Sequence, residues 1–277
     1  MDDERYYIGE VEKICNISKK TLRYYDKIGL LSPKEILSSN GYRHYNKEDI
    51  CKIPVIKYYK QSGFQLENIK QLIYSSDYLN IERSFNYKIE ELEEMEKELQ
   101  MKKKSLEDWN SLVKEARMVI DNNICNIGVK YLAKNEMLFL EQEFKYDYIS
   151  SIINIEFTNY IEEIDNAITG PVIIQFPSFE EKIQGKCKSI KIIQKNLKKC
   201  DEDKLIEFGG GLVISCYYLG NHKNIGEAYI KIKEWIKLHN YKCEDECYER
   251  YVIDYWTTND ENKFVTEIII KLKNNQK

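Results

Sequence analysis

A seven-residue apolar repeat runs through residues 77–122. The side chain at every seventh position is apolar, and the series is Phe85, Leu92, Leu99, Leu106, Val113 and Ile120. A second series, three residues further on, is only half apolar: Lys88, Met95, Lys102, Trp109 and Ala116. These are the a and d positions of heptads, so the pattern predicts a two-stranded coiled coil of helices about 65–70 Å long, at roughly 1.5 Å per residue. The alternative is a solvated helix that packs on its own domain.

The repeat divides the 277 residues into a front domain (1–76), the helix (77–122) and a back domain (123–277). Residues 1–75 contain 13 Lys and Arg against 10 Asp and Glu, a net charge of +3, which leaves −7 on the rest of the chain. A mildly basic front and an acidic back fit a nucleic-acid-binding module attached to a different domain. Because the excess is small, contact with nucleic acid depends on individually placed residues.

Residues 8–30 predict a helix-turn-helix. A short helix over 8–15 precedes a turn at 15–17, and Ser18 is an N-cap for a second helix. Leu22 and Tyr25 share one face of that helix, and Gly29 ends it. The other face carries the cations Lys19, Lys20, Arg23 and Lys27, together with Tyr24. The alternative is an amphipathic surface helix that merely exposes lysines.

A small two-stranded wing follows. Asn40-Gly41 is a strong hairpin signal, and strand-forming residues flank it. Arg43 and Tyr45 lie on the return strand, where the planar guanidinium of Arg43 suits a phosphate. Asn46 then caps a third helix that breaks at residues 61–64, and Pro54 inside it is expected to mark a kink or a misplaced helix boundary. A fourth helix covers residues 65–73.

In order, Tyr7-Ile-Gly-Glu-Val11, Thr21-Leu-Arg-Tyr-Tyr-Asp26, Gly29-Leu30, Tyr42-Arg43-x-Tyr45 and Gly63-Phe64-x-Leu66 resemble the DNA-binding domain of the MerR family of bacterial transcription regulators. The resemblance implies a winged helix-turn-helix, a dimer through an antiparallel pair of the long helices, and a palindromic double-stranded promoter that the regulator distorts for RNA polymerase. The positions expected at DNA are Lys19, Thr21, Arg23, Tyr24, Tyr25, Tyr42, Arg43, Tyr45 and, more weakly, Lys60.

Strands and helices alternate in the back domain. Strands are expected over 129–132, 137–144, 172–176, 186–193, 208–218, 247–256 and 264–272, and helices over 150–168 and 225–240. This order is a duplicated α+β plan. Gly209-Gly210-Gly211 is expected to be a turn or bulge, because no Lys-Ser/Thr follows it as in a phosphate-binding loop.

The order of elements, with Cys247-Tyr-Glu-Arg-Tyr251 and Phe264-Val-Thr-Glu-Ile268, is similar to the GyrI-like effector-binding domain of BmrR-like multidrug-sensing regulators. The resemblance implies that Glu249 lies in an aromatic pocket and attracts lipophilic cations, with Phe157, Tyr217 and Phe264 as pocket residues. By alternation, Tyr251 shares a strand face with Glu249 and joins the expected pocket. A cation would compensate a poorly solvated carboxylate through its charge and the ring faces. The alternatives are an exposed strand carboxylate for Glu249 and plain core packing for Phe157 and Phe264. By strand alternation, Glu267 falls on the opposite face from Phe264.

Two other functions compete with small-molecule sensing. A metal- or redox-sensing regulator is one alternative, and a soft-metal site needs clustered thiolates. Only Cys125 stands at the end of the long helix, Cys243 and Cys247 are four residues apart with no third ligand nearby, and the other five cysteines share no spacing. Some GyrI-like domains are thought to hydrolyse small molecules, and Glu249 with Tyr217 or Tyr251 could act as base and hydrogen-bond donor. We therefore expect a cytoplasmic, homodimeric regulator that is not an enzyme, has no cofactor, metal site or membrane contact, and activates transcription when its effector binds.

Overall fold

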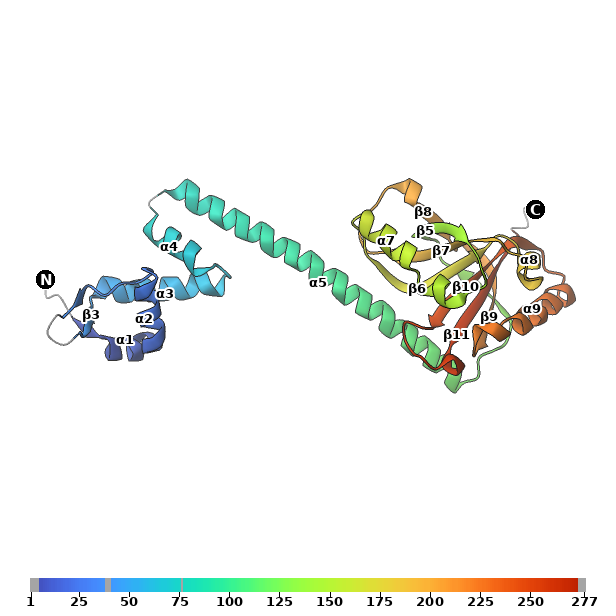
Figure 1. Cartoon of the computed structure of the whole chain (residues 1–277), viewed down its shortest axis with the longest axis horizontal. Helices are drawn as coiled ribbons and strands as arrows, with labels where there is room; N and C mark the ends of the chain where they lie inside the picture. Colours follow the sequence, from blue (N-terminus) through green and yellow to red (C-terminus); the bar gives the residue numbers. More distant parts are fainter. Residues whose placement is uncertain (1–4, 38–40, 76, 274–277) are drawn as a thin grey trace. The chain divides into compact units, whose positions relative to one another are not determined.

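Helix α5 (Tyr78–Asp121) is one continuous helix of 44 residues, as the heptad pattern predicts. The computed structural model describes residues 5–37, 41–75 and 77–273 (Figure 1). The chain forms two compact units, residues 1–98 and 99–277, and each is described by itself. In the first unit, Phe85 of the coiled-coil face packs against Tyr59 and Phe64, whereas Leu92 and Met95 are 46% and 51% exposed.

The first unit is a winged helix-turn-helix. A three-stranded sheet of order β1-β3-β2 accompanies the helices, and the elements are β1 (Tyr6–Tyr7), α1 (Ile8–Cys15), α2 (Lys19–Lys27), β2 (Glu35–Ile36), β3 (Arg43–Tyr45), α3 (Lys47–Gln61) and α4 (Leu66–Tyr74). Strand β1, which the sequence analysis did not predict, pairs with β3 through Tyr6–Tyr45 and Tyr7–His44. Asn40 of the expected hairpin signal lies outside the described residues, and Gly41 has a φ of +69°.

Local chemistry sets the helix ends of this unit. The Ser18 hydroxyl accepts from the Thr21 N–H at 3.1 Å, and Asn46 and Asp49 form a capping box at the start of α3. Helix α3 runs through Pro54 to Gln61, where the sequence predicts that it breaks, so no helix boundary lies at Pro54. Pro54 lies on the exposed side of α3. Its missing N–H therefore costs one intrahelical hydrogen bond and no core packing.

The second unit contains the last part of α5 and one eight-stranded antiparallel sheet. Its strands are β4 (Gly128–Leu132), β5 (Asn135–Glu143), β6 (Ile168–Phe176), β7 (Ser189–Asn196), β8 (Leu205–Phe208), β9 (Gly211–Leu219), β10 (Cys243–Ile253) and β11 (Val265–Leu272). Its helices are α6 (Tyr148–Ile152), α7 (Ile155–Glu163), α8 (Phe179–Ile183) and α9 (Gly226–Leu238), with 3₁₀ turns at η1 (Glu202–Lys204), η2 (His222–Asn224) and η3 (Glu261–Lys263).

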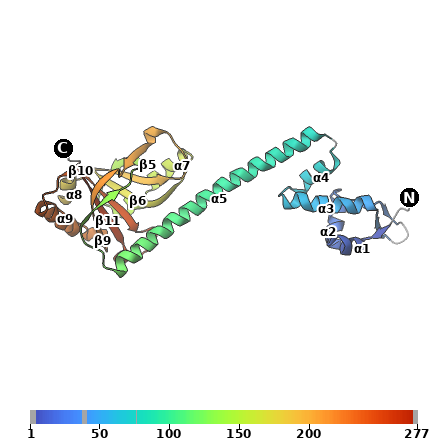
Figure 2. The same ribbon diagram turned by 180° about the vertical axis from the view of Figure 1, so that it is seen from behind.

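The strand order β4-β9-β11-β10-β6-β7-β5-β8 shows the predicted duplication. In one half, β5 is followed by a helical segment and the β6–β7 hairpin; in the other, β9 is followed by α9 and the β10–β11 hairpin. The two hairpins meet where β6 pairs with β10, with Glu249 opposite Ile174. Helices α7 and α9 lie toward opposite ends of the sheet in both views (Figures 1 and 2).

The two faces of the sheet have separate cores. The larger core joins the sheet to α7, α8 and α9 through residues such as Phe157, Phe179 and Ile232. On the other face, Leu112, Ala116 and Val119 of α5 pack with Val252, Ile253 and Val265. Ala116, a d position of the predicted seam, is therefore 3% exposed against its own domain, so the C-terminal part of α5 follows the alternative that the heptad analysis left open.

Of two further segments, one differs from the sequence prediction and one agrees with it. The helix expected over 150–168 is two helices, since Ile153 leaves the helical conformation (φ −88°, ψ 74°) and Asn154 caps α7. The glycine run forms the predicted turn, between β8 and β9, with Gly209 at φ +91° and Gly210 at φ +82°. A Cβ on Gly209 would lie 2.1 Å from the Ala133 carbonyl oxygen, so this turn needs glycine for space as well as for backbone conformation.

Candidate functional site

The exposed face of α2 carries the cationic residues that the sequence predicts at DNA. Lys19, Arg23 and Tyr24 are exposed and Thr21 is partly exposed. Lys19 forms a surface ion pair with Glu12 at 3.5 Å, and the Thr21 hydroxyl lies 2.8 Å from that of Ser18. Lys60 is exposed near the end of α3. This face can meet a polyanion without rearrangement of the core.

The wing is tied to α2 by one ion pair. Arg43 Nε donates to Asp26 Oδ2 at 2.9 Å, and the Arg43 side chain keeps 30% of its surface exposed. Tyr42 is 55% exposed and meets the Tyr7 ring edge-on at 6.3 Å between centroids. Arg43 therefore positions the wing against α2 as well as offering a cation at its surface.

Two of the predicted DNA-contacting tyrosines are core residues instead. Tyr25 is 3% exposed and Tyr45 is 1% exposed, and both pack in the core of the first unit. Among the described residues the Tyr45 hydroxyl has no hydrogen-bond partner; burial, with the Asp26 carboxylate nearby, raises its pKa to about 12. The prediction is wrong for these two side chains. Tyr25 faces inward because it lies one helical turn from Leu22, on the apolar face of α2, and Tyr45 packs in the same core.

Glu249 is the centre of a buried polar cluster in the second unit. The residue is 0% exposed. Its carboxylate accepts from Tyr229 Oη at 2.8 Å and from Tyr251 Oη at 2.6 Å, and Lys182 Nζ lies 2.9 Å from Oε1. The same ammonium donates to Tyr148 Oη at 2.6 Å. We call Glu249, Lys182, Tyr148, Tyr229 and Tyr251 the Glu249 site.

Burial controls the protonation of the tyrosines in this site. Desolvation, reinforced by the Glu249 charge, raises the pKa of Tyr148, Tyr229 and Tyr251 well above the ordinary value. These hydroxyls therefore stay protonated at neutral pH, and those of Tyr229 and Tyr251 act as donors to the carboxylate. A fully buried carboxylate with this many donors avoids the large cost of an unpaired buried charge.

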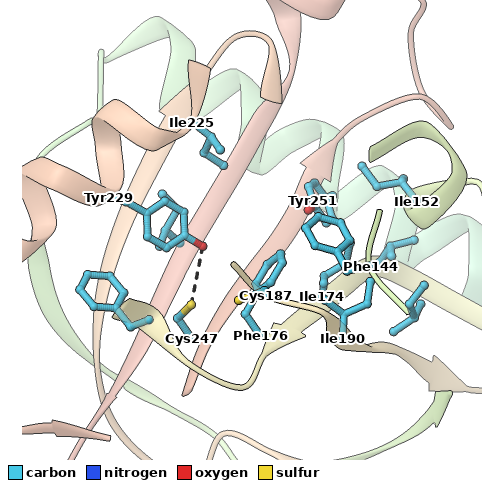
Figure 3. Close-up of a cluster of buried hydrophobic side chains, with 14 of the residues drawn as sticks. Phe144, Ile152, Ile174, Phe176, Cys187, Ile190, Ile225, Tyr229, Cys247 and Tyr251 are labelled. Atoms are coloured by element: carbon cyan, nitrogen blue, oxygen red, sulfur yellow. Dashed lines mark hydrogen bonds between the residues drawn. The ribbon is translucent and has the colours of Figure 1, made fainter. Parts of the chain in front are cut away.

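Aromatic rings surround the polar cluster. Lys182 Nζ lies 3.7 Å from the Phe176 ring centroid, 4.9 Å from Tyr148, 5.3 Å from Phe144 and 5.6 Å from Tyr229. These rings come from different elements, and Figure 3 shows Tyr229 extending from α9 with its hydroxyl directed at the Cys247 thiol, 3.8 Å away. Burial, then the nearby carboxylate, raises the pKa of Cys247, so this thiol is inert at neutral pH.

His222 continues the aromatic assembly. Its ring stacks between Tyr148 (5.1 Å) and Phe264 (4.9 Å) and meets Tyr251 edge-on at 5.0 Å. Burial lowers the pKa of His222 to about 4, against an opposing effect of Glu249, so the imidazole is neutral. Its Nε2 is 3.1 Å from the Thr266 hydroxyl. Phe264, predicted as a pocket residue, is thus linked to the Glu249 site through His222.

Of the two remaining predicted pocket residues, the structure places Tyr217 away from Glu249. Tyr217 lies on the opposite face of the sheet, where its hydroxyl donates to Glu115 of α5 at 2.7 Å. Its neighbour Tyr218 packs on the larger core instead, so the prediction for Tyr217 is wrong by one residue of strand alternation. Phe157 is buried in the larger core, and its ring stacks on Tyr160 at 6.4 Å.

A second charged cluster lies on the α5 face. Arg250 Nε donates to Glu267 Oε2 at 2.7 Å and Nη1 to Glu115 Oε2 at 3.2 Å, and Glu267 also bonds Lys130 and Ser215. Burial disfavours the Glu267 carboxylate, but Arg250 and Lys130 outweigh it and lower its pKa. Glu249 and Arg250 are adjacent on β10, so they face opposite sides of the sheet. Glu267 lies on the Arg250 side, and Phe264 lies on the Glu249 side beside His222. This is the separation of Glu267 from Phe264 that alternation predicts.

Sequence reasoning missed most of the Glu249 site. The missed residues come from both halves of the domain: Tyr148, Lys182, Tyr229 and His222. No regular spacing in the sequence relates them to one another or to Glu249. Helix α8, which supplies Lys182, has five residues and was not predicted, because so short a helix has no amphipathic period. Among the described residues, no three His, Cys, Asp or Glu side chains cluster as metal ligands do, and no helix is both long and apolar enough to cross a membrane.

Comparison with known proteins agrees with both units. The family model "MerR HTH family regulatory protein" matches residues 6–76, and "GyrI-like small molecule binding domain" matches residues 126–273. The multidrug-efflux transporter 2 regulator of Bacillus subtilis is 27% identical over 98% of each chain. The multidrug-efflux transporter 1 regulator of the same organism is 33% identical over 52% of this chain and 47% of that one.

A solved structure also matches. The cryo-EM structure of an EcmrR–DNA complex is 21% identical, with a TM-score of 0.45, over 96% of this chain and 99% of that chain. Fold, motifs and family models together define a helix-turn-helix regulatory protein fused to a small-molecule binding domain. The chain belongs to the MerR family of regulators that carry a C-terminal GyrI-like domain.

Proposed function

We propose that this protein is a homodimeric transcription regulator that binds a palindromic double-stranded promoter and responds to a small lipophilic molecule, cations included, at the Glu249 site. The observation that carries the effector assignment is a fully buried carboxylate, Glu249, within hydrogen-bonding distance of two tyrosines and surrounded by rings. Carboxylate and ring faces together recognise alkylammonium and similar cations. Two relatives are named for the regulation of multidrug transporters, which supports the same class of effector.

Dimerisation is proposed through the exposed seam of α5. Leu99 is 63% exposed and Leu106 is 71% exposed, although both are leucines at a positions of the heptad. Solvent-exposed leucines at that spacing are the surface that a second helix of the same kind covers. Two copies would then present two α2 helices to the half-sites of a palindrome.

Activation is proposed to follow the family mechanism. When effector occupies the second unit, the bound dimer distorts the promoter so that RNA polymerase can use this promoter. The regulator thus affects the polymerase through the DNA. The thermodynamic requirement is that the effector binds the two states of the regulator unequally. The protein senses its ligand and does not turn it over; a product that accumulates beyond one equivalent would instead establish hydrolysis, with Glu249 as base and Tyr251 as donor.

The DNA assignment is tested with a palindromic duplex selected from a random pool by the full-length protein. Arg23→Ala removes an exposed cation from α2, so affinity should fall and the slope of log K against log salt should decrease by about 1. Arg43→Ala should weaken binding on all sequences, because it loses a phosphate contact and frees the wing from Asp26. Tyr45→Phe is the matched control, since its hydroxyl is buried and should not affect DNA affinity. Unchanged salt slopes for both arginine variants would refute the assignment.

The effector assignment is tested by calorimetric titration of the full chain with phenyltrimethylammonium and with its uncharged isostere tert-butylbenzene. Glu249→Gln should weaken binding of the cation about tenfold or more, as expected for one desolvated charge interaction, and should change binding of the neutral isostere much less. Equal losses for the two ligands would contradict the charge-pairing role of Glu249.

A further inference from the structure

The Glu249 site already contains a cation that belongs to the chain. Lys182 Nζ contacts Glu249 Oε1 at 2.9 Å and Tyr148 Oη at 2.6 Å. Its side chain has 4% of its surface exposed, although lysine is almost never fully buried. The ammonium thus has the two kinds of partner, a carboxylate and a hydroxyl, that a bound organic cation would seek.

The rings give Lys182 the remaining features of a cation-binding cage. Phe176 lies 3.7 Å from Nζ to centroid, and Tyr148 and Phe144 lie 4.9 and 5.3 Å away. All three are within the roughly 6 Å at which a ring face attracts a cation. One site cannot accommodate a second cation at the same carboxylate oxygen and the same ring faces, so an incoming cation and Lys182 exclude each other.

The segment that carries Lys182 is a single short helix between two strands. Helix α8 has five residues, Phe179–Ile183, with Ser178 as its N-cap. Besides Lys182, Phe179 and Ile183 pack on the larger core, and the Phe179 ring lies 5.7 Å from that of Tyr229. A surface ion pair joins Glu180 and Lys233 at 2.5 Å, and the Cys187 thiol contacts the Ser178 carbonyl at 3.7 Å. The residues after it, Gln184 to Lys186, are exposed. Movement of α8 away from the sheet would withdraw Lys182 without disturbing a strand.

We propose that Lys182 is a tethered occupant of the effector's cation position, and that a cationic effector binds by displacing it together with α8. The proposal rests on the proposed function of the Glu249 site and specifies how that site is regulated. It makes effector binding and movement of residues 179–185 a single event. It also sets a specificity threshold, because a cation must bind better than the protein's own ammonium.

The magnitude follows from competition. If Lys182 vacates the cage in about 1–10% of molecules, the apparent affinity of a cation is reduced by that fraction, or about 10- to 100-fold. Removing the ammonium removes this reduction. Lys182→Met keeps most of the side-chain length and apolar bulk but cannot pair with Glu249. Lys186→Met, four residues further along an exposed stretch, makes the same change in net charge and is the matched control.

The experiment is a calorimetric titration of the full chain with phenyltrimethylammonium and tert-butylbenzene. Lys182→Met should bind the cation about 10- to 100-fold more tightly than the unsubstituted protein does, while Lys186→Met should equal the unsubstituted protein. Affinity for tert-butylbenzene should change much less. Unchanged or weaker cation binding by Lys182→Met would overturn the proposal, since Lys182 would then be a structural group or part of the ligand contact.

A rescue experiment covers a variant that folds poorly. Lys182→Ala removes three methylenes, Cγ, Cδ and Cε, together with the ammonium. These atoms correspond to n-propylammonium, so that ion can refill the cage. Propylammonium should raise the melting temperature of Lys182→Ala but not that of the unsubstituted protein, and n-propanol should do neither. Equal shifts in both proteins would overturn the proposal.

The two proposals fail in different ways. If Glu249→Gln weakens cation binding selectively but Lys182→Met gives no gain, the effector site stands and the tethered occupant is wrong. If Lys182→Met gains affinity for cation and neutral isostere equally, the variant has only enlarged the cavity, and the competition mechanism is wrong. If Glu249→Gln affects both ligands equally, the charge-pairing function itself fails.

Discussion

Removal of Arg250 should destabilise the second unit strongly. Arg250 is held between Glu267, which is 0% exposed, and Glu115 of α5, and its own side chain is 15% exposed. Breaking a buried pair by deleting one partner costs about 3–5 kcal/mol, because an uncompensated charge stays behind. Lys130 and Ser215 still contact Glu267 after the change, so we expect Arg250→Met to cost about 3 kcal/mol, at the low end of that range.

Urea unfolding followed by tryptophan fluorescence is the appropriate assay. The chain has three tryptophans, and Trp109, Trp235 and Trp256 all belong to the second unit, so the signal reports this unit alone. Lys130→Met is a useful control, since Lys130 is 40% exposed on the same carboxylate and should cost about 1 kcal/mol. Adding Glu267→Gln to Arg250→Met should cost less than the sum of the two single changes.

A loss below about 1 kcal/mol for Arg250→Met would refute the reasoning, because it would mean that water reaches Glu267 once the guanidinium is gone. The pH dependence offers an independent check. The folded-state pKa of Glu267 is lowered, so its contribution is complete above the ordinary glutamate pKa and is lost as the pH falls through the folded value. Arg250→Met should therefore flatten the stability profile on the acidic side.

Three further predictions follow from single features. The pKa of His222 is about 4 in the folded chain, so between pH 4 and 6.5 the unfolded chain binds a proton that the folded chain does not. The free energy of unfolding should therefore rise over this range, by an amount on the order of 3 kcal/mol. His222→Gln should remove that rise when urea unfolding is measured at each pH. Gly209→Ala should cost more than about 2 kcal/mol, because its Cβ would meet a backbone carbonyl at a positive φ. Gly210→Ala shares the positive φ, but its Cβ would meet side-chain atoms of Glu207 and Lys134 and no backbone carbonyl, so it should cost less; equal costs would contradict the steric argument. Leu106→Lys should shift sedimentation from dimer to monomer. Lys97→Glu, at an exposed f position away from the seam, should not.

The sequence predicted those parts of the fold that depend on periodicity and turn chemistry. Helix α5 has six a positions in register, and the N-caps Ser18 and Asn46 act as their residue types require. Strands β10 and β11 are apolar enough to stand out. By contrast, Ile153 interrupts a continuous apolar stripe, and only the Asn154 cap distinguishes two helices from one.

The site was predicted less completely because its residues are brought together by topology. Glu249 and Tyr251 share a strand face, which alternation reveals. Tyr229 reaches them from α9 and Tyr148 from α6, through a fold that no local pattern specifies. Lys182 had no signal of its own: in the sequence it is one lysine among many, and only its burial against Glu249 distinguishes it.

The packing of α5 has a practical consequence for dissecting the protein. The match to the small-molecule binding domain begins at residue 126, but Leu112, Ala116 and Val119 are 4%, 3% and 0% exposed against the sheet. A fragment that starts at 126 would leave Val252 and Val265 bare and Arg250 without Glu115. A protease-resistant, soluble effector fragment should therefore begin near residue 99, inside the long helix, and carry the C-terminal part of that helix as a built-in amphipathic cover.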